Sequence, residues 1–277
     1  MIESSSSHRI QNARVFARLR GVGEPVLCLH GNPDSSLLWS RLWDELDAAG
    51  ALDHVQCVAP DLPGFGQSEV PPGFRFDKQG QADFLRDFLT TLKIKKPVTL
   101  VVHDFGGIYG LAFAAAYPEL IKRVLITNTL FFPDYRWHFF ARIWRTPLLG
   151  EIAMRAMIRP IFEAILLLGS KKLKRATIHE VYRHYTLAVR LMILKLYRAC
   201  DPPDFADWER RYLELAARVP VRVLWGARDP FIEEEFAHRF GTEDVRILQD
   251  CGHWVPLEEP GLLAEELRDF MGLAKTN

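Results

Sequence analysis

The stretch at residues 98–110, VTLVVHDFGGIYG, limits the possible folds of this chain more than any other. Apolar and β-branched residues stop abruptly at His103 and Asp104, two glycines follow, and an apolar pattern with helical spacing begins at Ile108. This pattern predicts a buried strand, a very tight turn and a helix, with one carboxylate at the apex of the turn. Because Asp is a favoured residue at the start of helices, the stretch alone leaves open a purely structural role for Asp104.

Predicted strands and helices alternate along the chain on both sides of this stretch. The further strands are expected at 25–29, 55–60, 124–127, 221–225 and 245–248, and the clearest amphipathic helices at 37–48, 77–92 and 261–271. Such alternation predicts an α/β fold with a parallel, mainly buried sheet and right-handed crossovers. The polar residues that follow the strands should then lie along one edge of the sheet, where such sheets bind ligands.

Two regions depart from this alternation. Residues 12–20 alternate apolar and polar side chains, which indicates an antiparallel edge hairpin with its turn at 21–23, after a flexible serine-rich start. From residue 131 the strand pattern gives way to helical periodicity rich in Arg, Leu and aromatic residues, and so long an excursion predicts a lid rather than a loop. We therefore expect a core domain built from 1–130 and 208–277, interrupted by a helical cap domain at 131–207.

Composition argues against several classes of partner. The chain has 35 Lys and Arg against 35 Asp and Glu, so its net charge of zero argues against nucleic acid or an anionic membrane as the main partner. The four cysteines show no paired spacing, so we expect reduced, mostly buried thiols, and neither a metal nor a cofactor. The first residues lack an apolar signal segment, and no apolar run approaches the roughly 20 residues of a membrane span. We expect a cytoplasmic monomer or homodimer.

Two further polar residues follow strands in the second half of the chain. Asp229 comes after the strand VRVLWG, and His253 comes after the strand VRILQD. Either one alone could be structural, since Asp229 fits a turn before a proline and a buried histidine can simply be hydrogen-bonded in the core. Together with Asp104, they give the chain order nucleophile, acid, histidine, which is typical of α/β-hydrolases, with Asp in place of Ser at the elbow. That order favours a catalytic site.

Five segments carry a resemblance to a known family. They are HGNPDSSLLW (30–39), DLPGFGQS (61–68), VVHDFGG (101–107), WGARDPF (225–231) and CGHWVPLEEP (251–260). The chain resembles the α/β-hydrolase superfamily, and specifically its aspartate-nucleophile branch of epoxide hydrolases and haloalkane dehalogenases. The resemblance implies a mostly parallel sheet flanked by helices, with a helical cap inserted after the sixth strand.

An aspartate nucleophile suits displacement at carbon. Attack on an sp³ carbon that bears a leaving group forms a stable alkyl ester of the enzyme, which is then hydrolysed at its own carbonyl. On the resemblance, Asp104 is the nucleophile, His253 activates the water, and Asp229 orients the His253 ring and stabilises its charge. The resemblance also implies an oxyanion hole made by the backbone N–H groups of Asn32 and Phe105.

The hydrogen-bond donors that face the leaving group decide whether the enzyme accepts a halide or an epoxide. Asn32 matches a halide-binding position of dehalogenases, but Phe105 stands where these enzymes commonly have a Trp, and it has no side-chain donor. An epoxide hydrolase instead uses lid tyrosines, and the segment ending at Tyr197 resembles one that carries such a tyrosine. The candidates for binding the substrate or leaving group are Asn32, Tyr135, Tyr182, Tyr185, Tyr197 and Trp137.

We therefore favour an epoxide hydrolase that acts on a small apolar organic substrate with water. Haloalkane dehalogenation is the first alternative, because HGNP and the valine at 102 are more typical of dehalogenases. A specialised hydrolase or lyase of a lactone or polyketide-like substrate is another, since the aromatic insertion would accept a bulky apolar ligand. A non-catalytic ligand-binding protein of the same fold is a hypothesis of a different class, against which the three intact polar residues weigh.

Overall fold

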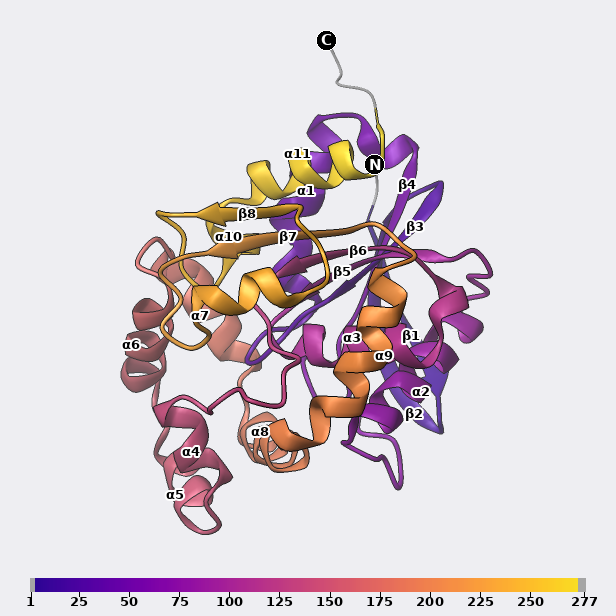
Figure 1. The fold of residues 1–277 in the computed structure, drawn as a ribbon. Coiled ribbons are helices and arrows are strands. Elements are labelled where there is room, and N and C mark those ends of the chain that lie inside the picture. The colour runs from indigo at the N-terminus through magenta and orange to yellow at the C-terminus, as the bar shows by residue number, and fades with distance from the viewer. Residues whose placement is uncertain (1–2, 274–277) are drawn as a thin grey trace.

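The computed structural model describes residues 3–273, and within them one eight-stranded sheet organises the fold (Figure 1). The strands lie in the order β1-β2-β4-β3-β5-β6-β7-β8, and every neighbouring pair from β4 to β8 is parallel. Their bounds are Ser4–Ile10 (β1), Ala13–Gly21 (β2), Glu24–Leu29 (β3), Val55–Pro60 (β4), Val98–His103 (β5), Ile121–Thr127 (β6), Val221–Gly226 (β7) and Val245–Leu248 (β8). This arrangement confirms the predicted fold class.

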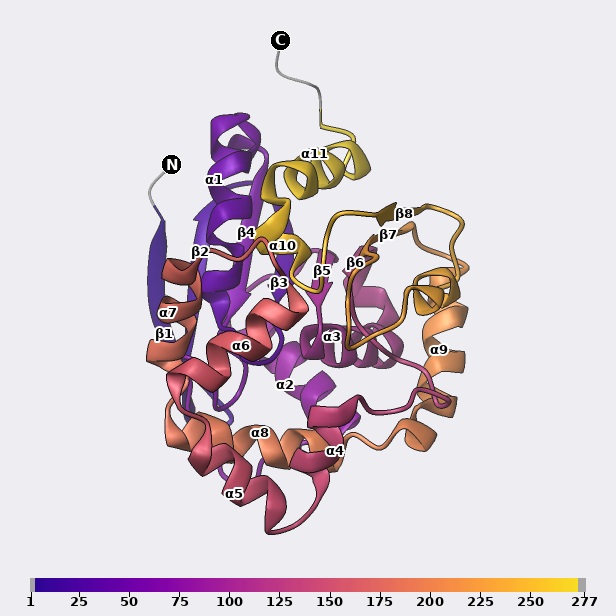
Figure 2. The same cartoon turned by 90° about the vertical axis from the view of Figure 1, so that its left-hand side faces the viewer.

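Helices cover both faces of the sheet. Helices α1 and α11 pack together on one face, and α2, α3 and α9 pack on the other (Figures 1 and 2). Their bounds are Ser40–Ala48 (α1), Lys78–Thr91 (α2), Phe105–Ala116 (α3), Ala206–Ala216 (α9) and Pro260–Phe270 (α11), with the short α10 at Val255–Glu258. All six residues of β5 are buried because this strand lies between two helical layers, which explains its continuous apolar character.

Five α-helices lie between β6 and α9, in the region where the sequence predicts helical periodicity. They are Phe139–Arg145 (α4), Leu149–Ala156 (α5), Arg159–Gly169 (α6), Arg175–His184 (α7) and Leu187–Ala199 (α8). Figure 1 shows α6 and α7 on the left, the side toward which the arrows of β7 and β8 point. Residues of α4, α6 and α8 line one cavity together with Asp104 and His253, which follow strands, so these helices stand over the carboxyl edge of the sheet. The predicted boundary at 207/208 falls in the first turn of α9, which packs against α3 of the core. None of the helices described in residues 3–273 is long and apolar enough to cross a bilayer.

The N-terminal hairpin differs from the prediction. Its turn is at Gln11 and Asn12, where both residues have positive φ (48° and 65°), and not at 21–23. The serines at 4–7 pair with residues 16–19 of β2, so the start that was expected to be flexible is a strand. The prediction was wrong because a hydroxyl-rich edge strand leaves no apolar alternation on which to recognise it.

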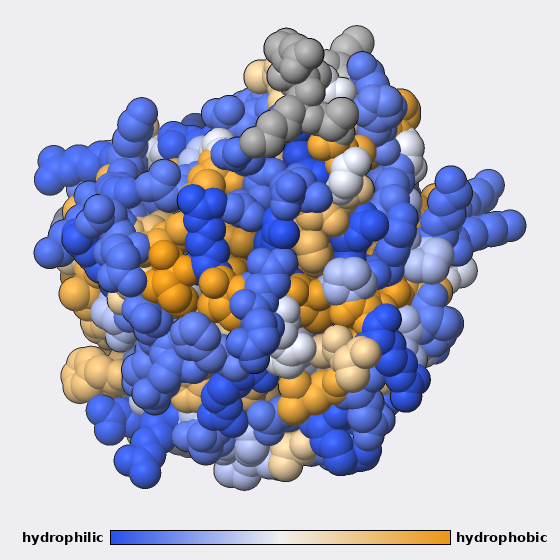
Figure 3. Space-filling model, turned by 45° about the horizontal axis from the view of Figure 1, so that its top comes forward, coloured by the Kyte–Doolittle hydropathy of each residue, from blue (hydrophilic) through white to orange (hydrophobic). Residues whose placement is uncertain are grey.

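Cysteines and hydrophilic residues divide between the interior and the surface of the protein. The four cysteines are buried and unpaired, which confirms that prediction for Cys28, Cys57, Cys200 and Cys251. Hydrophilic residues predominate on the face shown in Figure 3, with smaller apolar areas between them.

Candidate active site

The turn between β5 and α3 holds Asp104 in an unusual backbone conformation, with φ 49° and ψ −126°. Three hydrogen bonds fix this turn: the Asp104 N–H donates to the Asn128 carbonyl (3.0 Å), and the Asp104 carbonyl accepts from Gly107 N–H (2.8 Å) and from the Thr129 hydroxyl (2.6 Å). A Cβ at Gly106 would overlap with the Leu29 carbonyl, so glycine is what allows α3 to start this close to β3. The turn therefore presents the Asp104 side chain at the end of the sheet.

Backbone donors converge on the Asp104 carboxylate. The Asn32 N–H donates to Oδ1 at 2.6 Å, and the Phe105 N–H also contacts the carboxylate. Both groups are those expected for an oxyanion hole. A Cβ at Gly31 would overlap with the Asp104 side chain, so the loop after β3 can reach the carboxylate only with glycine at that position.

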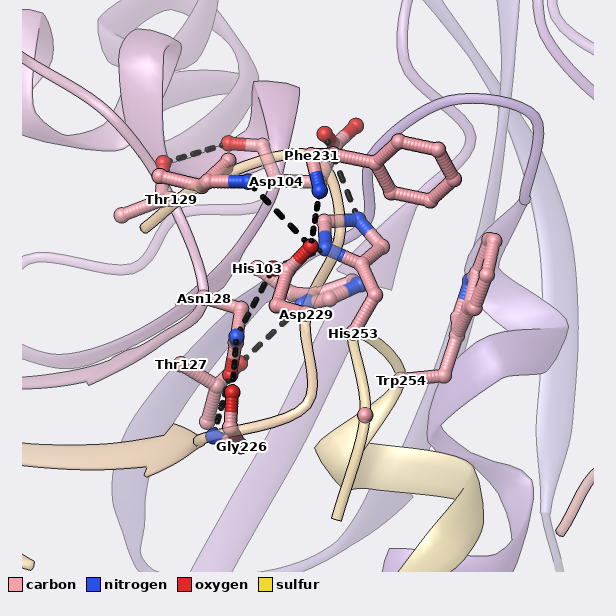
Figure 4. Close-up of polar contacts among 12 residues, drawn as sticks. His103, Asp104, Thr127, Asn128, Thr129, Gly226, Asp229, Phe231, His253 and Trp254 are labelled. Atoms are coloured by element: carbon pink, nitrogen blue, oxygen red, sulfur yellow. Dashed lines mark hydrogen bonds and ion pairs between the residues drawn. The ribbon is translucent and has the colours of Figure 1, made fainter. Parts of the chain in front are cut away.

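His253 lies between two carboxylates (Figure 4). Its Nδ1 is 2.6 Å from Asp229 Oδ2, and its Nε2 is 3.5 Å from Asp104 Oδ2. Burial alone lowers the pKa of His253, but the charges of Asp229 and Asp104 outweigh burial and raise that pKa to about 10. Burial would raise the pKa of Asp104, yet the contact with His253 holds that pKa below its ordinary value. The contacts with both carboxyl groups therefore favour the protonated form of His253.

Asn128 fixes the second carboxylate in place. Its Nδ2 donates to Asp229 Oδ2 (2.8 Å), and its Oδ1 accepts from the Gly226 N–H (2.9 Å) (Figure 4). The other oxygen of Asp229 accepts from the backbone N–H groups of Phe231 (2.8 Å) and Ile232 (3.2 Å). The ends of β6 and β7 therefore hold one rigid acceptor for His253.

A mostly apolar cavity opens in front of Asp104 and His253. Five of the six predicted binding residues line it, namely Asn32, Tyr135, Trp137, Tyr185 and Tyr197, and Phe105, predicted for the oxyanion hole, lines it as well. Tyr182 does not: its hydroxyl accepts from Arg190 (3.1 Å) and lies 3.5 Å from the Met157 carbonyl. It packs against Phe162 and Tyr185 instead, and Tyr185 itself lies just beyond α7, which ends at His184.

The polar atoms of the lining are few. Tyr135 donates its hydroxyl to the Phe231 carbonyl (2.8 Å), and the Tyr185 hydroxyl points to the Met154 sulfur. The Tyr197 hydroxyl lies 3.4 Å from the Asn32 amide nitrogen. The indole N–H of Trp137 is buried without a hydrogen-bond partner among the described residues. Asn32 therefore keeps one amide N–H beyond the one it donates to Tyr197, and among the described residues the Tyr197 hydroxyl and the Trp137 indole N–H have no acceptor, so these three groups of the predicted set can donate to a ligand.

His138 is a lining residue that sequence reasoning missed. Its Nδ1 accepts the Ala141 N–H at the start of α4 (3.3 Å), which leaves the proton of the neutral ring on Nε2. Burial lowers the pKa of His138 to about 4, so this ring is neutral. The only sequence signal was a histidine within the region of helical periodicity, and nothing in that pattern pointed to the cavity.

Trp254 and Asp34 were missed as well. Trp254 lines the cavity beside His253 and donates its indole N–H to the buried Asp34 carboxylate at 2.9 Å. Burial raises the pKa of Asp34 to about 7. The two residues belong to the segments HGNPDSSLLW and CGHWVPLEEP, but no local pattern predicts that they touch.

Comparisons with known proteins agree with the fold and with these segments. The family model for the alpha/beta hydrolase family matches residues 26–266. The cis-3-alkyl-4-alkyloxetan-2-one decarboxylase of Shewanella oneidensis is 30% identical over 92% of this chain and 84% of its own length. Haloalkane dehalogenase 2 of Mycobacterium tuberculosis is 27% identical over 91% of this chain and 89% of its own. An epoxide hydrolase structure from Vigna radiata superposes with a TM-score of 0.79 over 98% of both chains at 18% identity.

The fold and the strand-end site define an α/β enzyme of the hydrolase type. The chain belongs to the alpha/beta hydrolase family. Membership of this family supports an enzymatic role rather than a purely binding one.

Proposed function

We propose that Asp104 is a nucleophile that opens a strained oxygen ring at carbon, and that the substrate is a 3,4-dialkyl oxetan-2-one, a β-lactone. The observation that carries the proposal is the placement of one carboxylate oxygen against the apolar cavity while Asn32 N–H holds the other. The relative from Shewanella oneidensis, whose name describes decarboxylation of such a lactone, supports the substrate class.

The reaction balances without water or a cofactor. An Asp104 oxygen attacks ring carbon C4, and the C4–O bond breaks, which gives an alkyl ester and a free carboxylate on C3. The bond from C3 to this carboxylate then breaks, its electron pair forms the C3=C4 double bond, and Asp104 leaves C4 as a carboxylate. The products are an alkene and CO2.

The site suits both steps. Aromatic and aliphatic side chains would hold the alkyl groups, and the Asn32 amide and Tyr197 hydroxyl can donate to the ring oxygen as it gains charge. The imidazolium of His253 stabilises the ionised form of Asp104 before attack and after release. A low-dielectric cavity also favours loss of CO2, because charge leaves the carboxylate as that bond breaks.

Epoxide hydrolysis is the second candidate, and one observation favours it. Tyr197 brings a tyrosine hydroxyl close to the Asn32 amide, where an oxirane oxygen could be polarised. Haloalkane dehalogenation would use Asn32 with Trp137, whose unpartnered indole N–H could replace the donor that Phe105 lacks. In both reactions His253 must activate water. Loss of the Asp104 charge on ester formation would lower the pKa of His253 and free it to act as that base.

Turnover in ¹⁸O-labelled water separates these reactions. A cis-3,4-dialkyl oxetan-2-one, a styrene-oxide-type epoxide and a 1,2-dibromoethane-type halide are each incubated with the protein, and the Asp104 peptide is analysed by mass spectrometry. Hydrolysis of an ester at its carbonyl places ¹⁸O in Asp104, whereas decarboxylation leaves Asp104 unlabelled. We expect alkene and CO2 from the lactone, no label in Asp104, and no product from the Asp104→Asn variant.

His253→Phe provides the complementary measurement. If the reaction is hydrolytic, this variant accumulates an ester on Asp104 with the epoxide or halide. The lactone would be rejected as the substrate if it gave no alkene and Asp104 became labelled with another substrate. Diol release would then favour epoxide hydrolysis, and halide release would favour dehalogenation. A hydroxy acid from the lactone would show hydrolysis instead of decarboxylation.

A further inference from the structure

Exposed apolar side chains gather on one part of the molecule. Residues 139–168 contain seven of the ten large apolar side chains that are exposed in the described part of the chain. We call this set the apolar face, and it consists of Phe139, Leu148, Leu149, Ile152, Ile158, Ile161 and Leu168, which are 45–78% exposed. A water-exposed monomer rarely leaves such a cluster uncovered without a binding role.

The apolar face belongs to helices on one side of the molecule. Helices α4, α5 and α6 occupy the left of Figure 1 and the front of Figure 2, so both views place them on the same side of the molecule. A shallow groove on this side is lined by Phe140, Pro160, Ile161, Ala164, Ile165 and Leu168.

Positive charge is concentrated around the apolar face. Residues 136–174 contain eight Lys and Arg but only two Glu, although the two signs balance over the whole chain. Both acids are already paired, Glu151 with Arg198 and Glu163 with Arg175. Arg142, Arg155 and Arg159 are exposed among the apolar side chains and have no carboxylate within ion-pair distance in residues 3–273. The balanced total therefore hides a local cationic surface.

A single side chain separates this surface from the cavity. Ile165 of α6 lines the exposed groove and also the cavity that contains Asp104. An apolar molecule held against the apolar face would thus be one residue away from the candidate active site.

We propose that the apolar face docks on the surface of an anionic lipid bilayer. Aliphatic and aromatic side chains would enter the headgroup boundary, and the unpaired arginines would contact lipid phosphates. A bilayer fits better than a protein, because mobile phosphates can reach arginines on three helices without a matched set of acidic side chains. The docking is peripheral, in keeping with the absence of a spanning helix among the described residues. It does not depend on the reaction proposed above.

Flotation with vesicles tests the proposal on the full chain without any substrate. Vesicles of 70% phosphatidylcholine and 30% phosphatidylglycerol are compared with pure phosphatidylcholine, each at 0.1 M and 0.5 M salt. We expect binding to the anionic vesicles that weakens at high salt. The double variant Arg155→Gln, Arg159→Gln should bind about thirtyfold more weakly, from about 1 kcal/mol for each arginine.

Ile152→Glu places a charge in the apolar face and should weaken binding about a hundredfold. The matched control is Val22→Glu, an equally drastic change at an exposed residue between β2 and β3, which should bind like the unchanged protein. Circular dichroism checks that each variant is folded. Absence of vesicle binding, equal binding to both compositions, or equal loss in the Val22→Glu control would overturn the proposal. So would a dimer in sedimentation that Ile152→Glu dissociates, since a second copy would then cover the face.

Discussion

Three carboxyl groups lie around the candidate site, and two of them are held in one way and the third in another. Asp104 and Asp229 share the charge of His253, and each also accepts backbone N–H groups. Asp34 accepts only the indole N–H of Trp254 among the described residues. Burial without a cation makes ionisation costly, which is why the pKa of Asp34 rises to about 7 while that of Asp104 is lowered.

The Asp34→Asn variant should be more stable than the unchanged protein above pH 7. The pKa of Asp34 is higher in the folded than in the unfolded chain, so the folded state favours protonated Asp34. The stability that protonated Asp34 contributes is therefore fully present below about pH 4 and is lost as pH rises through about 7. Asparagine keeps an acceptor for Trp254 but carries no charge. At pH 8 we expect a gain on the order of 3 kcal/mol in the free energy of unfolding, measured with urea. The gain should vanish near pH 4, and the exposed Asp250→Asn control should show none; a less stable Asp34→Asn at pH 8 would contradict this account.

The pKa of His253 should fall when Asp104 loses its charge. Two carboxylates raise this pKa to about 10, so Asp104→Asn should move it toward 6.5. The ring proton signal of His253, assigned by its absence in His253→Phe, can be followed by NMR between pH 5 and 11. Because the folded pKa is raised, His253 stabilises the fold fully below about pH 6.5, and this contribution is lost as pH rises to about 10. The exposed Asp53→Asn should leave the titration unchanged, and an unshifted pKa in Asp104→Asn would refute the pairing.

At the scale of elements, the elbow between β5 and α3 depends on the loop after β3. The sequence predicted the strand, the turn and the helix at 98–110 correctly, because apolar runs and paired glycines are local signals. It could not predict that Gly31, on another strand end, leaves the space that Asp104 occupies. That contact joins residues 73 positions apart and has no local pattern.

Gly31→Ala should displace the Asp104 carboxylate and disable the site. The added Cβ would overlap with the Asp104 side chain, so the carboxylate must turn away from Asn32 N–H. A misplacement of about 1 Å can cost about a hundredfold in rate, and we expect a loss of at least that size in kcat/KM with whichever substrate is turned over. Gly261→Ala is the matched control, because its Cβ would meet only ordinary contacts near Glu45. Full activity in Gly31→Ala would show that the carboxylate does not depend on this approach.

At the scale of the whole molecule, α6 and the His253 loop meet through two glycines. The Gly169 carbonyl, at the end of α6, accepts the His253 N–H at 2.8 Å, and a Cβ on Gly252 would overlap with that carbonyl. The helices after β6 therefore help to position the histidine as well as covering the cavity. The sequence predicted the helices and the histidine but gave no sign of the role of Gly169, since a contact between distant segments leaves no periodic signal.

Gly169→Ala should consequently impair the site from a helix outside the sheet. The new Cβ would overlap with Trp254 and crowd Phe231, so either α6 moves outward or the His253 loop shifts. We expect kcat/KM to fall about ten- to a hundredfold, with a loss of about 1–3 kcal/mol in unfolding free energy from overpacking. Leu168→Ala, at the neighbouring exposed position, should change neither quantity strongly, because that side chain is 53% exposed. If Gly169→Ala lost stability but kept full kcat/KM, α6 would be a cover with no part in placing His253.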